Sequence, residues 1–283
     1  MQVVVIGAAN VDIIAKSKAG IKQGDSNLAD INLKAGGVAR NIAAMLALRK
    51  VDVDLITAVG NDPFGNLLRE SCAGIGINTD AWIVKTNAST GVNLVTYENS
   101  GELYTGFNAT SAPETIRTAE LTKHRNRIKE ADLLILDLNL SEKILALALE
   151  FRNEHAVMVD AVSAEKASRA KGFLDKIDIL KLNRREAEVL TGIKLDTKQR
   201  VKQAAYSLVN SGVKRVFITL GMAGVCAADA NNVIFVPAVP IVVKSKAGAG
   251  DAFSAGLAMK FAKDLRTQAE AGVSTAAEHL GRM

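Results

Sequence analysis

Short runs of β-branched and aliphatic residues alternate with helix-like segments along the whole chain, and this alternation restricts the possible folds more than any other feature. The runs lie at residues 3–7, 53–60, 132–139, 156–162, 178–183 and 215–221. Each run is almost continuously hydrophobic, which is typical of strands buried on both faces of a sheet. Because strands that alternate with helices form parallel sheets with right-handed crossovers, the sequence predicts an α/β fold with a mainly parallel central sheet.

Two stretches depart from this alternation. Residues 89–108 alternate apolar and polar side chains around an Asn-Ser-Gly turn, which predicts a hairpin with one wet face, and residues 13–34 are similarly strand-like and rich in turns. We expect the two stretches to form a small β-sheet that acts as a lid over the site. No long linker separates them from the rest, so residues 1–283 are expected to form one domain.

The overall composition is that of a folded protein with no preference for nucleic acids or membranes. Of 283 residues, 48% are hydrophobic and 23% charged, and the net charge of +5 is spread without a basic block or interleaved aromatic residues. The start lacks a signal-peptide pattern, and no apolar run is long enough to span a membrane. Cys72 and Cys226 are isolated, so no disulfide or zinc site is indicated, and a cytoplasmic location is expected.

Polar residues follow most of the predicted strands. Since ligands of open α/β sheets bind beyond the carboxyl ends of the strands, these residues are expected to surround a site. They are Asn10, Asp12, Asp137, Asn139, Asp160, Ser163, Asn183, Glu186 and Thr219.

A glycine-rich turn at residues 245–256 leads into an alanine-rich helix with a single acid, Asp251, where they join. The amides of Gly248, Ala249 and Gly250 at a helix N-terminus would form an anion hole. A carboxylate just beyond it would repel phosphate but would accept a proton from a hydroxyl that attacks the phosphate. Asp251 is therefore placed like the base of a phosphoryl transfer, although a plain turn with an N-capping Asp has the same pattern.

Two further segments suggest a phosphoryl-transfer site. Gly36 and Gly37 run into a helix that carries Asn41, so a polyol can approach the backbone and bond to the amide, although a loop that feeds a helix is the alternative. Asn183 ends a predicted strand and Glu186 begins the next helix. Glu186 is interpreted either as a helix cap or as a ligand of Mg²⁺ through water.

Together these motifs resemble the PfkB family of ribokinase-like carbohydrate kinases, in the family's order and along nearly the whole chain. The resemblance implies a three-layer αβα fold, ATP and Mg²⁺ as cofactors, Asp251 as catalytic base and residues 248–250 as its anion hole. It implies sugar contacts from Asn10 and Asp12. It also implies nucleotide contacts from Asn183, Thr219, Gly221 and Gly224.

Within that family, the sequence is most similar to the pseudouridine kinases. The similar strings are residues 24–43, with Arg40 before Asn41, residues 137–141, which contain Asn139, and residues 159–166. The resemblance implies transfer of the γ-phosphoryl group of ATP to the 5′-hydroxyl of pseudouridine. Further substrate contacts are expected from Asp25, Ser26 and Asn27, with Asn27 at the uracil edge.

Two expectations concern partners and ions. Many relatives have Asp-Thr before the glycine turn, where the Asp helps to hold a monovalent cation, whereas this chain has Ser245 and Lys246, so activation by K⁺ is not expected. The edge strand of the predicted lid needs a cover, and pairing of two lids would supply a homodimer.

Two alternatives remain open. One is another ribokinase-like kinase, acting on a purine nucleoside, ribose or a hexose. The other is a nucleoside-binding protein without catalysis, which the altered cation motif and the early end of the chain after Asp251 would favour.

Overall fold

The fold is described from a computed structural model of the chain, which covers residues 1–109, 112–242 and 247–282. Ser245 and Lys246, on which the expectation about K⁺ depends, lie outside the described residues.

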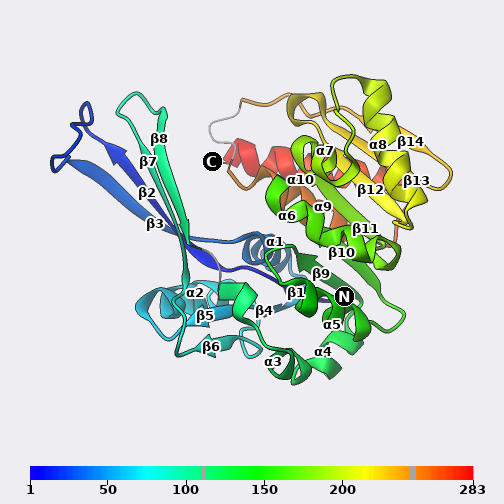
Figure 1. Cartoon of the computed structure of the whole chain (residues 1–283), viewed down its shortest axis with the longest axis horizontal. Helices are drawn as coiled ribbons and strands as arrows, with labels where there is room; N and C mark the ends of the chain where they lie inside the picture. Colours follow the sequence, from blue (N-terminus) through cyan, green and yellow to red (C-terminus); the bar gives the residue numbers. More distant parts are fainter. Residues whose placement is uncertain (110–111, 243–246, 283) are drawn as a thin grey trace.

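A large sheet forms the centre of the molecule, and its strands confirm the predicted α/β class (Figure 1). Its order is β14-β13-β12-β11-β10-β9-β1-β4. The strands from β12 to β4 pair in parallel, whereas β13 is antiparallel to both of its neighbours, β12 and β14. The strands are β1 (Gln2–Ile6), β4 (Asp52–Ile56), β9 (Leu133–Asp137), β10 (Ala156–Asp160), β11 (Ile179–Asn183), β12 (Arg215–Thr219), β13 (Val225–Asp229) and β14 (Val233–Val236). The expected strand at 53–60 is in fact two strands, because β5 (Ala58–Gly60) leaves the large sheet and pairs with β6 (Ile83–Lys85).

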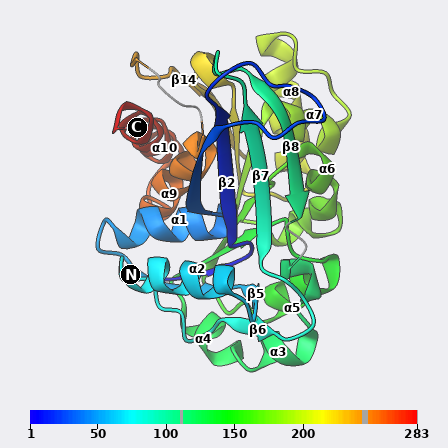
Figure 2. The same cartoon turned by 90° about the vertical axis from the view of Figure 1, so that its left-hand side faces the viewer.

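Helices cover both faces of this sheet, so the three-layer prediction is also confirmed (Figure 2). One face packs against α1 (Val38–Ala47), α2 (Pro63–Ala73), α9 (Ala249–Met259) and α10 (Leu265–Arg282). The other face packs against α3 (Thr118–Thr122), α4 (Arg125–Glu130), α5 (Glu142–Glu150), α6 (Ala164–Ala167), α7 (Arg184–Thr191) and α8 (Lys198–Asn210). Alternate strand residues face each core, for example Val3 one and Val4 the other. The runs are therefore hydrophobic throughout because neither face is exposed to water.

A small four-stranded sheet projects from one side of the main body (Figure 1). Its order is β3-β2-β7-β8, with β2 (Asn10–Ser17), β3 (Ala29–Gly36), β7 (Gly91–Tyr97) and β8 (Leu103–Ala109). The stretches 13–34 and 89–108 thus form a sheet of their own, as expected. That this small sheet acts as a lid stays a prediction.

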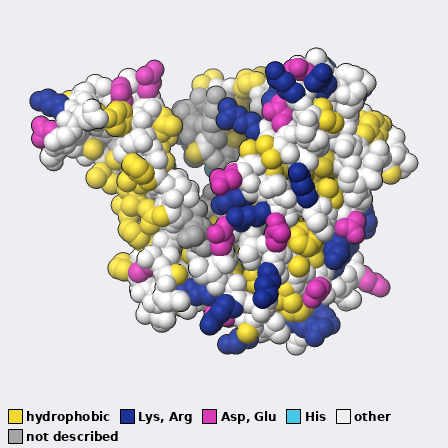
Figure 3. Space-filling view, in the orientation of Figure 1, with side chains coloured by type: hydrophobic (Ala, Val, Ile, Leu, Met, Phe, Trp, Pro, Cys, Tyr) yellow, Lys and Arg dark blue, Asp and Glu magenta, His cyan; other side chains and the backbone are white. Residues whose placement is uncertain are grey.

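The two faces of the small sheet differ in chemistry. One row across the strands is polar and consists of Lys34, Asp12, Asn93 and Asn108. The adjacent row, on the opposite face, is apolar and consists of Leu33, Ile13, Leu94 and Phe107, of which Leu33 and Phe107 are exposed. Hydrophobic side chains accordingly gather along the projecting sheet, and the surface is hollowed between this sheet and the main body (Figure 3).

Within residues 1–109, 112–242 and 247–282, the structure contains no helix of the length and apolarity that a membrane crossing requires.

Candidate active site

The first turn of α9 lies at the carboxyl edge of the large sheet and supplies free backbone donors. Gly248 precedes the helix with a φ of 72°, a left-handed conformation that favours glycine. The first helical bond across this turn runs from the Ala252 amide to the Gly248 carbonyl oxygen, at 2.9 Å. Amides earlier in the turn have no partner inside a helix, so they are available to an anion.

This turn forms a wall between two cavities of different chemistry. Gly248 and Asp251 line a polar cavity of about 790 Å³. Ala249 and Gly250, between them in sequence, line a second, mainly apolar cavity. A group transferred between ligands in the two cavities would therefore pass the amides of this turn.

Asp251 is half-buried at the polar cavity and is held by Asn41. Its Oδ2 accepts a hydrogen bond from Asn41 Nδ2 at 2.8 Å. Burial, and then the charge of Asp160, raise the pKa of Asp251 to about 7, against the lowering effects of Asn41 and Lys181. A carboxyl group with a pKa near 7 suits general base catalysis at neutral pH.

Arg40 fixes which way the Asn41 amide points. Arg40 Nη1 donates to Asn41 Oδ1 at 3.3 Å and to the Ala35 carbonyl oxygen at 3.1 Å. Since the Asn41 oxygen faces the guanidinium group, its Nδ2 group faces Asp251.

A second carboxylate, Asp12, lies on the polar face of the small sheet. Its Oδ1 accepts from Asn10 Nδ2 at 2.7 Å and from Asn93 Nδ2 at 3.3 Å. Burial raises the pKa of Asp12, while these amides lower it. A Cβ at Gly36 would lie 2.3 Å from Asp12 Oδ2, so only glycine fits beside this carboxylate.

Asp137 joins the segments that form the floor of the polar cavity. Its Oδ2 accepts from the amides of Ala8 and Ala39 at 2.9 and 3.0 Å, and its Oδ1 accepts from the Asn139 amide at 2.9 Å. The side chain is fully buried, and burial raises its pKa. Asp137 thereby fixes the start of α1, where Gly37 has a φ of 97° and a Cβ would lie 2.4 Å from the Ala8 carbonyl oxygen.

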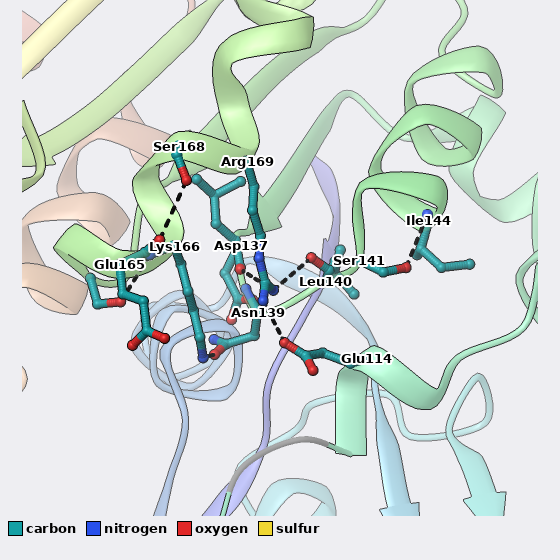
Figure 4. Close-up of polar contacts among 12 residues, drawn as sticks. Glu114, Asp137, Asn139, Leu140, Ser141, Ile144, Glu165, Lys166, Ser168 and Arg169 are labelled. Carbon is teal, nitrogen blue, oxygen red and sulfur yellow. Dashed lines mark hydrogen bonds and ion pairs between the residues drawn. The ribbon is translucent and has the colours of Figure 1, made fainter. Parts of the chain in front are cut away.

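A wall of mixed charge, in which Lys166 lies with Glu114 and Glu165, closes another side of the polar cavity (Figure 4). Lys166 Nζ donates to Asn139 Oδ1. Arg169 Nη1 donates to the carbonyl oxygens of Leu138 and Leu140, and its Nη2 pairs with Glu114 Oε1 at 2.6 Å. This wall presents both donors and acceptors to a ligand, whereas the carboxylates of Asp12 and Asp251 on the other side present acceptors.

Asp160 connects the cavity to the sheet beneath it. Its Oδ1 accepts from the Val162 amide at 3.0 Å, and Val162 has a φ of 66°, which is rare for a β-branched residue. Residues in this conformation cost about 1–3 kcal/mol and cluster at functional sites.

Asn183 and Glu186 form a capping box at the start of α7. The Asn183 side chain accepts from the Glu186 amide at 3.0 Å, and Glu186 Oε2 accepts from the Asn183 amide at 2.7 Å. Burial raises the pKa of Glu186. The capping interpretation is therefore present in the structure, and the role of Glu186 toward Mg²⁺ stays a prediction.

The apolar cavity lies on the side expected to bind a nucleotide. Thr219, Gly221 and Gly224 line it, together with Phe253 and side chains of α10. Gly224 has a φ of 86°, and a Cβ there would lie 2.0 Å from the Val236 carbonyl oxygen. Glycine is thus required where the β12–β13 turn borders the cavity.

The structure brings most of the predicted residues together. The polar cavity is lined by Asn10, Asp12, Gly37, Asn41, Asn139, Gly248 and Asp251.

The predicted contacts Asp25, Ser26 and Asn27 are exposed in the turn between β2 and β3, and they do not line this cavity. Asn27 accepts from the Lys22 amide at 2.8 Å and donates to backbone oxygens of the same turn. Since β2 has eight residues and a strand rises about 3.3 Å per residue, the turn lies on the order of 25 Å along the sheet from Asn10. Their contact with substrate stays a prediction.

Several residues at the site were not predicted as contacts from the sequence. They are Asn93, Asn108, Glu114, Glu165, Lys166 and Lys181. The alternation of β7 and β8 signals a wet face, but only the register shows that Asn93 and Asn108 stand beside Asp12.

Comparison with known proteins defines the class to which this fold and site belong. The family of pfkB family carbohydrate kinases matches residues 1–283. The chain therefore belongs to the PfkB family and is a kinase of sugars or nucleosides.

Individual relatives share most of the chain. It is 34% identical to the pseudouridine kinase of Escherichia coli (strain K12), over 93% of this chain and 87% of that protein. It is 28% identical to the ribokinase of Staphylococcus aureus (strain COL), over 95% of this chain and 89% of that protein. Among solved structures, Arabidopsis thaliana ribokinase complexed with ribose and ATP superposes with a TM-score of 0.84 at 25% identity, covering 99% of this chain and 92% of that one.

Proposed function

We propose that this kinase transfers the γ-phosphoryl group of ATP to the 5′-hydroxyl of pseudouridine. The observation that carries the proposal is the position of the α9 turn, with Asp251 facing the polar cavity and Ala249 and Gly250 facing the apolar one. ATP would bind in the apolar cavity and the nucleoside in the polar one, so the transferred group would meet the amides of residues 248–250.

Asp251 acts as the base in this reaction. As the hydroxyl oxygen forms a bond to the γ-phosphorus, its proton passes to Asp251, and the bond from that phosphorus to the departing ADP oxygen breaks with its electron pair. Asn41 holds the carboxylate in place through its 2.8 Å hydrogen bond. Since phosphoryl transfer requires little covalent work from the protein, positioning and the amide donors account for most of the catalysis.

Mg²⁺ is expected to arrive with ATP. Magnesium in kinases is commonly bound by substrate phosphates, waters and one or two carboxylates, so an all-protein cage is not needed. Among the residues that the structure describes, no group of three or more His, Cys, Asp or Glu is placed to hold a metal. The buried Glu186 fits a role through water. Bound Mg²⁺ would neutralise charge on the phosphates.

The mixture of donors and acceptors on the wall that contains Lys166 and Glu165 supports a nucleoside over a simple sugar. The ring of pseudouridine carries two carbonyl oxygens and two N–H groups. Lys166 and Asn139 offer donors for the oxygens, and Glu165 and Ser163, which also line the cavity, offer acceptors for the N–H groups. Uridine lacks one of these ring N–H groups because its glycosidic bond occupies that nitrogen. The similarity to the E. coli pseudouridine kinase supports the same assignment.

A substrate panel with Mg-ATP tests the proposal. We expect kcat/KM for pseudouridine to exceed the values for uridine, ribose, inosine, guanosine and fructose by about a hundredfold, the scale of one lost hydrogen bond to a charged group such as Glu165. Glu165→Gln should reduce the preference for pseudouridine over uridine. Preference for ribose or uridine would overturn the substrate assignment and leave the kinase class intact.

The similarity to ribokinases favours ribose as the second candidate. A half-buried carboxylate with a raised pKa at the junction of two cavities argues against a nucleoside-binding protein without catalysis. That alternative predicts thermal stabilisation by nucleoside and none by ATP, because only bound ligands raise the apparent stability.

We also propose a homodimer formed through the small sheets. The exposed Leu33 and Phe107 belong to the apolar row on the face opposite the polar cavity. Exposed apolar rows of this kind commonly mark an interface.

A further inference from the structure

Lys181 is a buried lysine in the middle of the central strand β11, and the mechanism above does not use it. It is 5% exposed and pairs with Asp160, which is 1% exposed, at 3.1 Å between Nζ and Oδ2. The two residues are direct partners in the register of β10 and β11. Burial lowers the pKa of Lys181, but Asp160, Glu186 and Asp251 together raise it above its ordinary value. The lysine is therefore a permanent positive charge inside the site.

This charge lies directly against the anion hole. A Cβ at Gly250 would lie 3.0 Å from Lys181 Nζ, so the Gly250 backbone rests on the ammonium group. Asp160 Oδ2 also accepts from Ser254 Oγ, one turn along α9 from Gly250, at 2.6 Å. The ion pair is thus attached to the helix whose first turn carries Asp251.

Asp251 is surrounded by more negative than positive charge. Asp160 on β10 and Asp137 on β9 raise its pKa, while Lys181 on β11 and the Asn41 amide on α1 lower it. On the remaining side, His279 of α10 lies 3.1 Å from the Ala247 carbonyl oxygen, beside the turn. Among the residues that the structure describes, Lys181 is the basic group whose charge lowers the pKa of Asp251, whereas Arg40 reaches Asp251 only through Asn41.

We propose that Lys181, held by Asp160, is a positioning residue for phosphoryl transfer: its ammonium group keeps the Asp251 carboxylate ionised and supports negative charge at the Gly250 amide. The inference depends on Asp251 being the base, as proposed above, and it does not depend on which acceptor is phosphorylated. Neither residue exchanges a proton or contacts the acceptor, so both act through Asp251 and the backbone.

The proposal predicts opposite effects from two substitutions in one ion pair. Lys181→Met removes the positive charge, so the midpoint of the Asp251 titration should rise by about one pH unit, a tenfold change in proton affinity. Asp160→Asn removes a negative charge, so the midpoint should fall by about the same amount. The double variant should lie near the wild type. If the ion pair had only a structural role, the two substitutions would not shift the Asp251 midpoint in opposite directions.

The titration is measured by NMR on the full chain with aspartate labelled at the carboxyl carbon, without ligands. The Asp251 signal is assigned by its absence in Asp251→Asn. Lys85→Met is the matched control, because Lys85 is as buried as Lys181 and pairs with Glu120 at 2.5 Å outside the site. It should cost stability and leave the Asp251 midpoint unchanged. Shifts in the same direction, or no shift in either variant, would overturn the proposal.

A kinetic measurement gives the second readout. The acid limb of the pH profile of kcat/KM is measured with any acceptor that the substrate panel identifies. It should move to higher pH in Lys181→Met and to lower pH in Asp160→Asn, and Lys181→Arg should restore the wild-type limb. If Lys181→Met does not fold, Asp160→Asn alone decides, since an unchanged midpoint there contradicts the proposal. Failure of pseudouridine as substrate leaves the titration unaffected, so the two failures are distinguishable.

Discussion

The two cavities on either side of the α9 turn differ in how they would bind a ligand: one through placed polar groups and the other through its shape. The polar cavity places its carboxylates and amides through buried hydrogen bonds, such as those of Asp12 with Asn10 and of Asp251 with Asn41. The apolar cavity depends on shape, with small residues of α10 and a glycine turn that leave room for a flat ligand. Binding in the polar cavity should therefore be sensitive to side-chain charge, and binding in the apolar cavity to side-chain volume. A substitution that changes charge should affect KM for the acceptor, and one that changes volume should affect KM for ATP.

The largest expected effect belongs to the charge on Asp251. Asp251→Asn should keep acceptor binding but reduce kcat by about three orders of magnitude, because it removes the base that we propose acts in the transition state. Steady-state kinetics and calorimetric binding measure both quantities. Asp52→Asn makes the same change at the opposite edge of the sheet and should have no effect. Activity of Asp251→Asn within tenfold of the wild type would remove it from this role.

The charge on Asp12 should matter for the acceptor alone. Asp12→Asn should raise KM for the nucleoside by about 10- to 100-fold, the value of one charged hydrogen bond of about 1.5–3 kcal/mol, and leave KM for ATP unchanged. Asp30→Asn is the control, since Asp30 lies on the same sheet in an exposed pair with Lys18. Equal changes in both KM values would contradict the division between the cavities.

Side-chain volume should matter in the apolar cavity. Ala276 lines the apolar cavity, so Ala276→Phe should raise KM for ATP by about tenfold, equivalent to 1.4 kcal/mol, and leave nucleoside binding intact. Ser274→Phe, at an exposed position of the same helix, is the control. A loss of nucleoside affinity instead would show that the cavities are assigned the wrong way round.

Burial of Asp251 should also cost stability in a pH-dependent way. Its pKa is about 7 in the folded protein against an ordinary 3.8, so the folded state binds a proton that the unfolded state has lost. Stability from this group is present below pH 3.8 and is lost as pH rises toward 7, by at most about 1.4 kcal/mol per pH unit. Asp251→Asn should therefore be increasingly more stable than the wild type between pH 5 and 7, with a constant difference above, in denaturant unfolding. A constant difference over the whole range would contradict the raised pKa.

The smallest effect on catalysis is expected outside both cavities. Phe107→Ser on the apolar row should shift the protein from dimer to monomer in light scattering at micromolar concentration, with little change in either KM. Leu48→Ser removes an equally exposed leucine elsewhere as a control. A wild-type monomer at that concentration would contradict the proposed dimer.

Much of the fold was predictable because it rests on local patterns. Alternating runs and helical segments identify a parallel sheet without knowledge of contacts, and the glycine turn before Asp251 is a continuous motif. The sequence also places the strand ends in one neighbourhood, which is why Asn10 and Asn139 were predicted to lie together, and the glycine motifs before Asn41 and Asp251 identified these two helix residues.

The remaining parts of the site depend on contacts between distant segments. In the sequence, Lys181 is one residue of a predicted strand and has no visible partner. Only the strand register pairs it with Asp160, and only the packing of α9 places Gly250 beside it. Asn93 and Asn108 become part of the site only through strand pairing. Asp25, Ser26 and Asn27 precede the diglycine closely in sequence, yet the length of β2 and β3 places their turn far along the small sheet.

The Asp137 carboxylate accepts amides from Ala8, Ala39 and Asn139, three segments that are up to 131 residues apart along the chain. Contacts of such long range form late, because the loops between them must close first. The acceptor pocket therefore requires these three segments to come together, so the ability to bind the acceptor during refolding should appear only after they have met.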